Sequence, residues 1–161
     1  MLECKFKGCN VGEPLSDLAT FNINDLKANI IARFDYYLQY LGFKDAWKRE
    51  LYEGDVIELT ITPDLMDVTK DGFACSNLGK YIKEQGDITT VGMIFKYDNT
   101  FLGVHYDLYF YRNGKLIRDE DGNVEIETSG ADYNFPIYLC QKGAVRIGNI
   151  VSEPKLLNKF C

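Results

Sequence analysis

The chain has 161 residues, with 24 acidic and 18 basic side chains, a formal net charge of −6 and a pI of about 4.8. That balance argues against a protein that coats nucleic-acid phosphates, because such binding depends on clustered lysine and arginine. Hydrophobic residues make up 46% of the chain, which is enough for the packed core of one domain spanning residues 1–161. No run approaches the ~20 apolar residues of a membrane span, and the first residues lack the apolar stretch of a signal peptide. We therefore expect no membrane partner.

The five cysteines are odd in number and scattered, and none forms a C-x-x-C pair. This usage fits reduced thiols in the cytoplasm better than a disulfide framework. A structural zinc site needs closely spaced ligand pairs, and His105 is the only histidine. The sequence therefore predicts a cytoplasmic protein without a metal site or a cofactor.

The first part of the chain predicts a strand at 2–7, where apolar and charged residues alternate, and then a loop at 8–14. Apolar residues recur every four positions further on, at Leu26, Ile30, Phe34 and Leu38. That spacing predicts an amphipathic helix near 24–38, so that residues 1–38 form an N-terminal extension that carries a helix. Gly42 is a candidate C-terminal cap for this helix. The aromatic run at 36–43 fits a helix or a strand, and the pattern leaves the choice open.

The clearest single strand follows the acidic corner Glu53-Gly54-Asp55. Between Val56 and Thr62, aliphatic side chains alternate with Glu58, Thr60 and Thr62. Alternation with a period of two is typical of a half-buried strand, and Pro63 ends it. The glycine allows the chain to turn sharply into the strand.

The second half predicts a short helix near 77–85 and then an antiparallel meander of about four strands from Thr90 to Thr128. Asn113-Gly114 and Asp121-Gly122 are strong signals for hairpin turns. Two more strands are predicted, at 134–140 and 145–151.

One helical turn near residue 154 closes the chain, with Pro154 at its first position. Many short strands with one or two helices predict a mainly β (α+β) fold. We expect a partly open small β-barrel or a rolled antiparallel sheet.

Two stretches resemble the YopX-like family of phage and prophage proteins. The first is QYLGFKDAWKRELYEGDVIEL, residues 39–59, and the second is IGNIVSEPKLL, residues 147–157. The matching positions are Gln39, Tyr40, Gly42, Lys44, Asp45, Glu50, Tyr52, Glu53, Gly54, Asp55, Ile147, Gly148, Asn149, Ile150, Pro154, Leu156 and Leu157.

The resemblance implies a phage-derived protein with a largely β, barrel-like core, acting inside a bacterial host cell. It supplies no catalytic residues. Ala46-Trp47 replaces the family's Lys-Asn, and Lys48 stands in place of its turn glycine. We therefore expect this hairpin to be looser or shaped differently.

The matched positions predict structural roles rather than chemistry. The Glu53-Gly54-Asp55 corner has the residue types for holding a cation, but a turn glycine followed by a side-chain acceptor explains it without a ligand. We interpret eight residues as a structural motif: Gly42, Tyr52, Glu53, Gly54, Asp55, Gly148, Asn149 and Pro154.

A second set of candidates shares one predicted strand face: His105, Asp107, Tyr109 and Tyr111. A histidine and an aspartate two residues apart could act as an acid–base couple. The tyrosines could anchor a partner, because they bury area at low entropic cost. The alternative is that the protein's own helix covers this face, and the sequence leaves both readings open.

These observations favour a non-enzymatic module that binds a protein partner or assembles with itself as a homo-oligomer. One alternative is a nucleic-acid-associated small barrel, or an acidic mimic of DNA, although the net charge makes direct nucleic-acid binding the weaker hypothesis. The other alternative is an enzyme that uses His105 and Asp107.

Overall fold

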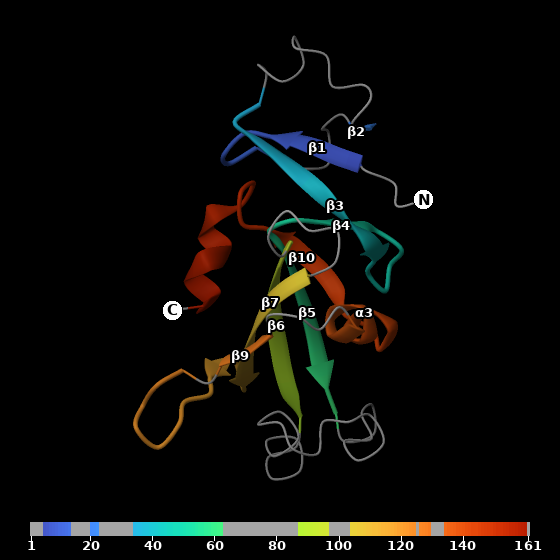
Figure 1. The fold of residues 1–161 in the computed structure, drawn as a ribbon. Helices are drawn as coiled ribbons and strands as arrows, with labels where there is room; N and C mark the ends of the chain where they lie inside the picture. The colour runs from blue at the N-terminus through green and yellow to red at the C-terminus, as the bar shows by residue number, and fades with distance from the viewer. Residues whose placement is uncertain are drawn as a thin grey trace.

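The computed structural model describes residues 5–13, 20–22, 34–62, 87–96, 104–124, 126–129 and 134–160. These residues form two antiparallel sheets and two short helical segments, so the predicted mainly β fold is confirmed (Figure 1). The described strands do not close into a barrel.

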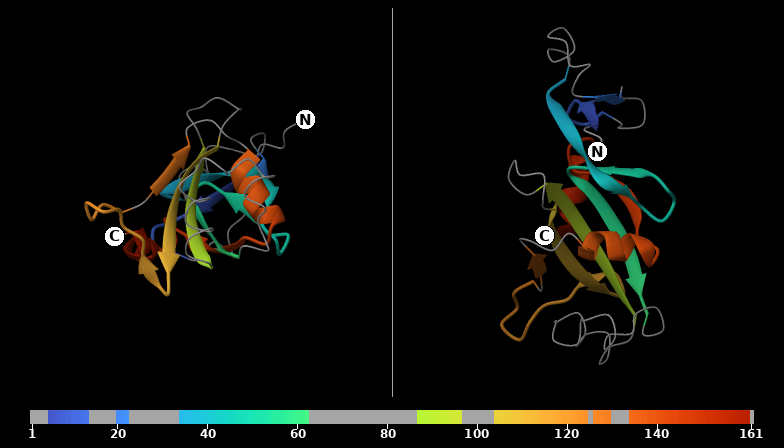
Figure 2. Two further views of the ribbon diagram at one scale, coloured as in Figure 1. Left: turned by 90° about the horizontal axis from the view of Figure 1, so that it is seen from below. Right: turned by 45° about the vertical axis from the view of Figure 1, so that its right-hand side comes forward.

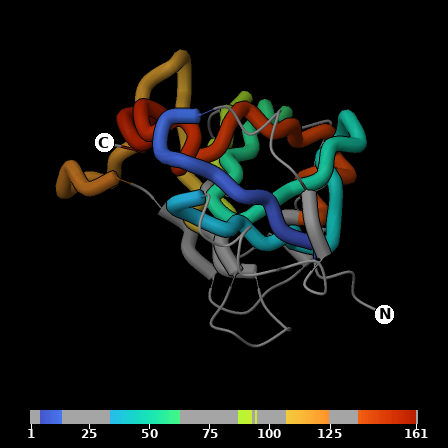
Figure 3. Tube along the Cα trace, turned by 90° about the horizontal axis from the view of Figure 1, so that it is seen from above, coloured from blue at the N-terminus to red at the C-terminus, as the bar shows by residue number. Residues whose placement is uncertain are grey.

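The first sheet has four strands in the order β2-β1-β3-β4. Their bounds are β1 Lys5–Cys9, β2 Thr20–Asn22, β3 Tyr36–Lys44 and β4 Glu50–Tyr52. β1 pairs with β3 in the register Phe6 opposite Gln39, which ties the start of the chain to the segment that carries the first motif. Viewed from above, this sheet crosses over the end of the second one (Figure 3).

The second sheet has six strands, in the order β10-β5-β6-β7-β8 with β9 also paired to β7. Its strands are β5 Asp55–Ile61, β6 Ile88–Lys96, β7 Val104–Arg112, β8 Lys115–Leu116, β9 Ile126–Ser129 and β10 Val145–Asn149. The predicted Asn-Gly turn joins β7 to β8, with φ of 50° at Asn113 and 74° at Gly114. Positive φ at both positions is what a two-residue type I′ hairpin requires.

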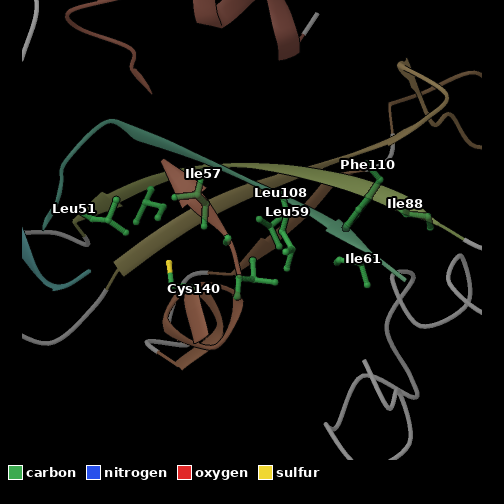
Figure 4. Close-up of a cluster of buried hydrophobic side chains, with 11 residues drawn as sticks. Leu51, Ile57, Leu59, Ile61, Ile88, Leu108, Phe110 and Cys140 are labelled. Atoms are coloured by element: carbon green, nitrogen blue, oxygen red, sulfur yellow. The ribbon is translucent and has the colours of Figure 1, made fainter. Parts of the chain in front are cut away.

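Two short helices cover opposite faces of this second sheet (Figure 2). The α-helix α3, Asn134–Gln141, packs on the face that presents Ile57, Leu59 and Ile61 of β5 (Figure 4). The 3-10 helix η3, Pro154–Phe160, packs on the face that presents Val56. The period of two along β5 divides its side chains between these faces. Full burial of each aliphatic side chain contributes about 1.5–3 kcal/mol.

The prediction of a strand at 134–140 is wrong, because this segment is the helix α3. A short apolar run such as Ile137 to Cys140 does not distinguish a buried strand from a buried helix by its periodicity. Pro136 lies in the first turn of the helix, where its missing N–H group has no intrahelical partner to lose. Packing of Leu139 and Cys140 against the sheet therefore determines that this segment is a helix and not a strand.

The helix predicted near 24–38 is contradicted at its end, because β3 begins at Tyr36. The rest of that prediction, like the helix near 77–85, falls outside the described residues. Residues 36–43 are thus a strand, and Gly42 lies inside it with φ of 89°, where the register with β4 shifts between Tyr40 and Lys44. A glycine with positive φ suits such a bulge, so Gly42 is not a helix cap.

Candidate functional site

The Glu53-Gly54-Asp55 corner joins the first sheet to the second. Gly54 adopts φ of 75°, its N–H donates to the Ile94 carbonyl at 2.9 Å, and its own carbonyl accepts from the Ile150 N–H at 2.9 Å. Asp55 then begins β5 directly opposite Asn149 of β10. The two motifs at residues 39–59 and 147–157 therefore meet in space and form one structural unit.

Asp55 is completely buried at this junction. Its Oδ2 accepts the Tyr52 N–H at 2.7 Å and its Oδ1 accepts the Asn149 side-chain amide at 2.9 Å. The Arg146 guanidinium lies 3.7 Å from Oδ2. Burial raises the pKa of Asp55 to about 6, and the Arg146 charge and the Tyr52 N–H oppose that rise only in part.

Asn149 completes the junction, because its side chain satisfies two backbone groups as well as Asp55. Its Nδ2 also donates to the Glu53 carbonyl at 2.8 Å, and its Oδ1 accepts the Val151 N–H at 3.0 Å. Gly148, just before it, leaves room that a Cβ would take from Leu156 of η3, whose Cδ1 lies 2.5 Å from that position. The polar groups of the corner are thus engaged by the chain itself.

A second buried carboxylate, Asp45, organises the hairpin between β3 and β4. Its Oδ1 accepts the backbone N–H groups of Trp47 and Arg49 at 3.0 and 2.9 Å. Its Oδ2 accepts Arg49 Nε at 2.7 Å and the Arg146 N–H at 2.9 Å. Burial alone raises the pKa of Asp45, but the bonds from the Arg146 N–H and from Arg49 outweigh burial and hold that pKa below its usual value.

The hairpin that Asp45 organises carries an exposed tryptophan. We call residues 44–49 the Trp47 tip. The Trp47 side chain is 68% exposed, and the Arg49 guanidinium carbon lies 4.6 Å from the centre of its ring. Lys44 and Lys48 are also exposed. Sequence reasoning treated Trp47 only as a departure from a family motif. The available signal was a lone tryptophan among polar residues in a hairpin.

Lys48 occupies the position of the expected turn glycine and adopts φ of 65°. Its N–H donates to the Asp45 carbonyl at 2.9 Å. A lysine therefore occupies the left-handed position of this turn. The carbonyl of Asp45 holds the turn through the Lys48 N–H, and its carboxylate holds it through the N–H groups of Trp47 and Arg49. The sequence predicted a hairpin that is looser or shaped differently. The hydrogen bonds to Asp45 contradict the looser alternative, and the other stays a prediction.

Tyr109 and Tyr111 lie on one face of β7, as the alternation predicts, but both are half-buried. They pack in a cluster that includes Leu156 and Phe160 of η3. The Tyr109 and Phe160 ring centroids are 4.6 Å apart. For Tyr109, the structure favours cover by the protein's own helix, although the covering element is η3 and not the predicted N-terminal helix. Tyr111 also lines an open groove beside η3.

The proposed acid–base couple lies on the same strand. In the register of β6 and β7, His105 is opposite Phe95 and Asp107 is opposite Met93. Asp107 is half-buried, whereas the side chain of His105 lies outside what the structure describes. The couple therefore remains a sequence-based prediction.

A groove of about 410 Å³ opens beside η3, on the same sheet face as Tyr111. We call it the β8 groove, since β8 forms one of its walls. Its lining residues are Glu58, Thr89, Val91, Tyr111, Gly114, Leu116, Asn158 and Lys159. Glu58 and Lys159 form an ion pair of 3.5 Å at its edge.

Two cysteines of the described chain, Cys9 and Cys140, are free thiols and both are buried. Burial raises the pKa of Cys9, and burial followed by the charge of Asp45 raises the pKa of Cys140 to about 12. Neither thiol forms a reactive thiolate at neutral pH. Within the described ranges, no three His, Cys, Asp or Glu side chains gather closely enough to hold a metal ion.

Comparison of the chain with protein-family models, with curated proteins and with solved structures found no match. In the part of the chain that the structure describes, no helix has the length and apolar character needed to cross a membrane.

Proposed function

We propose that this chain is a non-enzymatic protein-binding module of phage or prophage origin, akin to the YopX-like proteins, and that it acts in the cytoplasm of a bacterial host. The observation that carries the proposal is the Trp47 tip. Tryptophan and arginine are the side chains most enriched among binding hot spots, and here they are stacked together at the end of a hairpin.

The construction of the tip supports this role, because a binding anchor works best when it is held in place before the partner arrives. Asp45 fixes the backbone at Trp47 and at Arg49, so little conformational entropy remains to be lost on binding. The stacked guanidinium lies over one face of the indole, which leaves the rest of the ring accessible. A partner can therefore bury a large aromatic surface at low cost.

The hydrogen bonds of the two buried carboxylates support a structural role for both. Asp45 and Asp55 are each bound by donors from at least two elements of the chain. These bonds join the hairpin and the corner to β10, so the network holds the Trp47 tip against the second sheet.

A photo-cross-linking amino acid placed at position 47 in bacterial cells tests the proposal. The matched control places it at Val11, another apolar side chain that is 56% exposed. We expect protein adducts from position 47 and not from position 11, identified by mass spectrometry. Absence of adducts at position 47, or the same adducts at both positions, would refute a binding role for the tip.

The second candidate, single-stranded nucleic acid, is favoured by the combination of Trp47 with Lys44, Lys48 and Arg49. Bases stack on exposed aromatic rings, and nearby basic groups attract the backbone. The net charge of −6 opposes it, and the Arg49 charge is already paired with Asp45 at 2.6 Å. A gel-shift assay at low salt with labelled single strands decides, because retention of the probe by the native chain and not by Trp47→Ala would favour this candidate.

A further inference from the structure

We propose that the partner of the Trp47 tip is a second copy of this chain, whose β8 groove receives the indole ring. The inference rests on the proposed binding function and names its partner. It joins two features at separate places on the same molecule: a protruding aromatic side chain and a partly apolar groove that the chain itself leaves open.

The size and lining of the groove suit an indole with an attached cation. Its volume of about 410 Å³ lies within the range of roughly 300–1,000 Å³ typical of small-molecule sites. Val91, Tyr111 and Leu116 supply apolar and aromatic surface. Polar side chains at the edge, including Glu58 and Asn158, can accept hydrogen bonds from the indole N–H.

The charges around the two features are complementary. The tip exposes Lys44 and Lys48. Inside the groove, the charge of Glu58 is balanced by Lys159. The complementary negative charge comes from the hairpin after β8, whose residues 119–121 are all acidic and exposed. Opposite charges of this kind steer two copies into the correct orientation and disfavour contact between two tips.

The placement of the two features determines the type of assembly. The tip lies on one side of the molecule, and η3 and the hairpin after β8 lie on the other, in all the views (Figures 1, 2 and 3). A contact between different surfaces of identical chains is heterologous, so each bound copy leaves one free tip and one free groove. A contact confined to one side chain and one groove predicts weak, concentration-dependent association.

Complementation between two variants tests this arrangement. Trp47→Ala removes the tip side chain, and Leu116→Arg fills the groove with a long cation that repels the lysines of the tip. In sedimentation velocity, the native chain should form larger species as concentration rises, and each variant alone should stay monomeric. Loss of a hot-spot tryptophan weakens association by about 30-fold or more.

A mixture of the two variants should form a dimer and nothing larger, because the intact groove of one accepts the intact tip of the other. Val11→Ala, which alters an exposed residue outside both features, should associate like the native chain. If Leu116→Arg is misfolded by circular dichroism, Thr89→Arg blocks the same groove from β6.

A native chain that is monomeric at every concentration, or folded variants whose mixture contains no dimer, would overturn the proposal. The cross-linking experiment separates this failure from failure of the proposed function. Adducts from position 47 that contain only foreign proteins leave the binding function standing and exclude the second copy. Adducts that join position 47 to the peptide containing Leu116 support the head-to-tail contact.

Discussion

Two buried aspartates both lie close to Arg146 of β10, and they differ in how the chain compensates their charge. Asp45 belongs to the hairpin that carries Trp47, and Asp55 belongs to the corner where β5 begins. Both side chains are fully excluded from solvent. Yet the pKa of Asp45 is lowered, and the pKa of Asp55 is raised to about 6.

The difference has two causes: Asp55 lies deeper in the protein, so that burial raises its pKa more, and fewer donors reach its carboxylate. Asp45 accepts three backbone N–H groups and the charged guanidinium of Arg49. Asp55 accepts one backbone N–H and one neutral amide, and the nearest guanidinium atom of Arg146 is 3.7 Å away. Exclusion of the side chain from solvent therefore does not by itself determine the pKa of an aspartate; the depth of burial and the number and charge of the hydrogen-bond donors both contribute.

Removing the Asp45 carboxylate, which accepts more hydrogen bonds than that of Asp55, should have the largest effect on the free energy of unfolding. Asp45→Ala leaves two backbone N–H groups of the hairpin without acceptors and leaves Arg49 without its counter-ion. Breaking a buried ion pair from one side costs about 3–5 kcal/mol of the free energy of unfolding, and the one-third exposure of Arg49 places this variant at the lower end of that range. Urea denaturation followed by far-UV circular dichroism measures it, because Trp47, the only tryptophan, is already exposed and reports poorly on unfolding.

The control for this experiment is Asp121→Ala, which truncates an exposed aspartate in another hairpin. It should change the free energy of unfolding by no more than about 0.5 kcal/mol. If the two variants lose similar stability, Asp45 contributes no more than a surface carboxylate, and the contrast with Asp55 disappears.

The raised pKa of Asp55 predicts that its contribution to stability changes with pH in the opposite direction to the contribution of Asp45. Asp55 binds its proton more tightly in the folded chain, with a pKa of about 6, than in the unfolded chain, where the value is 3.8. Its contribution is therefore fully present below pH 3.8 and is lost as pH rises to about 6, by an amount on the order of 3 kcal/mol. Asp45, whose pKa is lowered, instead contributes stability that is lost as pH falls through its folded pKa.

The stability difference between the native chain and Asp55→Asn isolates this effect from about pH 4 to about pH 7. The native chain should lose stability relative to the variant as pH rises, because only the native chain must ionise the buried carboxyl group at position 55. His105, the only histidine, is common to both proteins and cancels. Parallel stability curves, or an NMR titration midpoint for Asp55 near the ordinary 3.8, would contradict the assignment.

Local patterns predicted the parts of the fold that local chemistry determines. The alternation at Ile57, Leu59 and Ile61 identified β5, and the Asn113-Gly114 pair identified the hairpin between β7 and β8. The helix α3 was missed because contacts with the sheet, and not its own short apolar run, decide its structure.

The candidate site was predictable only in part, because its contacts join distant segments. The corner residues and Asn149 were identified as motif positions, but their pairing arises from the register of β5 with β10. Asp45 gave no sign of its bond to the Arg146 backbone, which lies 101 residues further along the chain. The alternation placed Tyr109 and Tyr111 on one face, but nothing in it indicated that η3 would cover Tyr109.

The smallest expected effect concerns Lys48, which makes the turn that Asp45 holds in place. Its φ of 65° lies in the left-handed region, where a Cβ is unfavourable and glycine is not. Lys48→Gly should therefore raise the free energy of unfolding by about 0.5–1 kcal/mol, the part of the strain that the greater freedom of glycine in the unfolded chain does not offset. Urea denaturation of the variant measures the change.

The matched control is Lys44→Gly, four residues earlier and also exposed, at the end of β3 and without a positive φ. A glycine inside a strand costs about 0.5–1 kcal/mol, so this variant should change stability in the opposite direction. Equal losses in both variants would mean that the lysine is not strained at position 48. In that case the Asp45 hairpin, like the corner at Asp55, would derive its shape from its hydrogen bonds alone, with no opposing backbone strain.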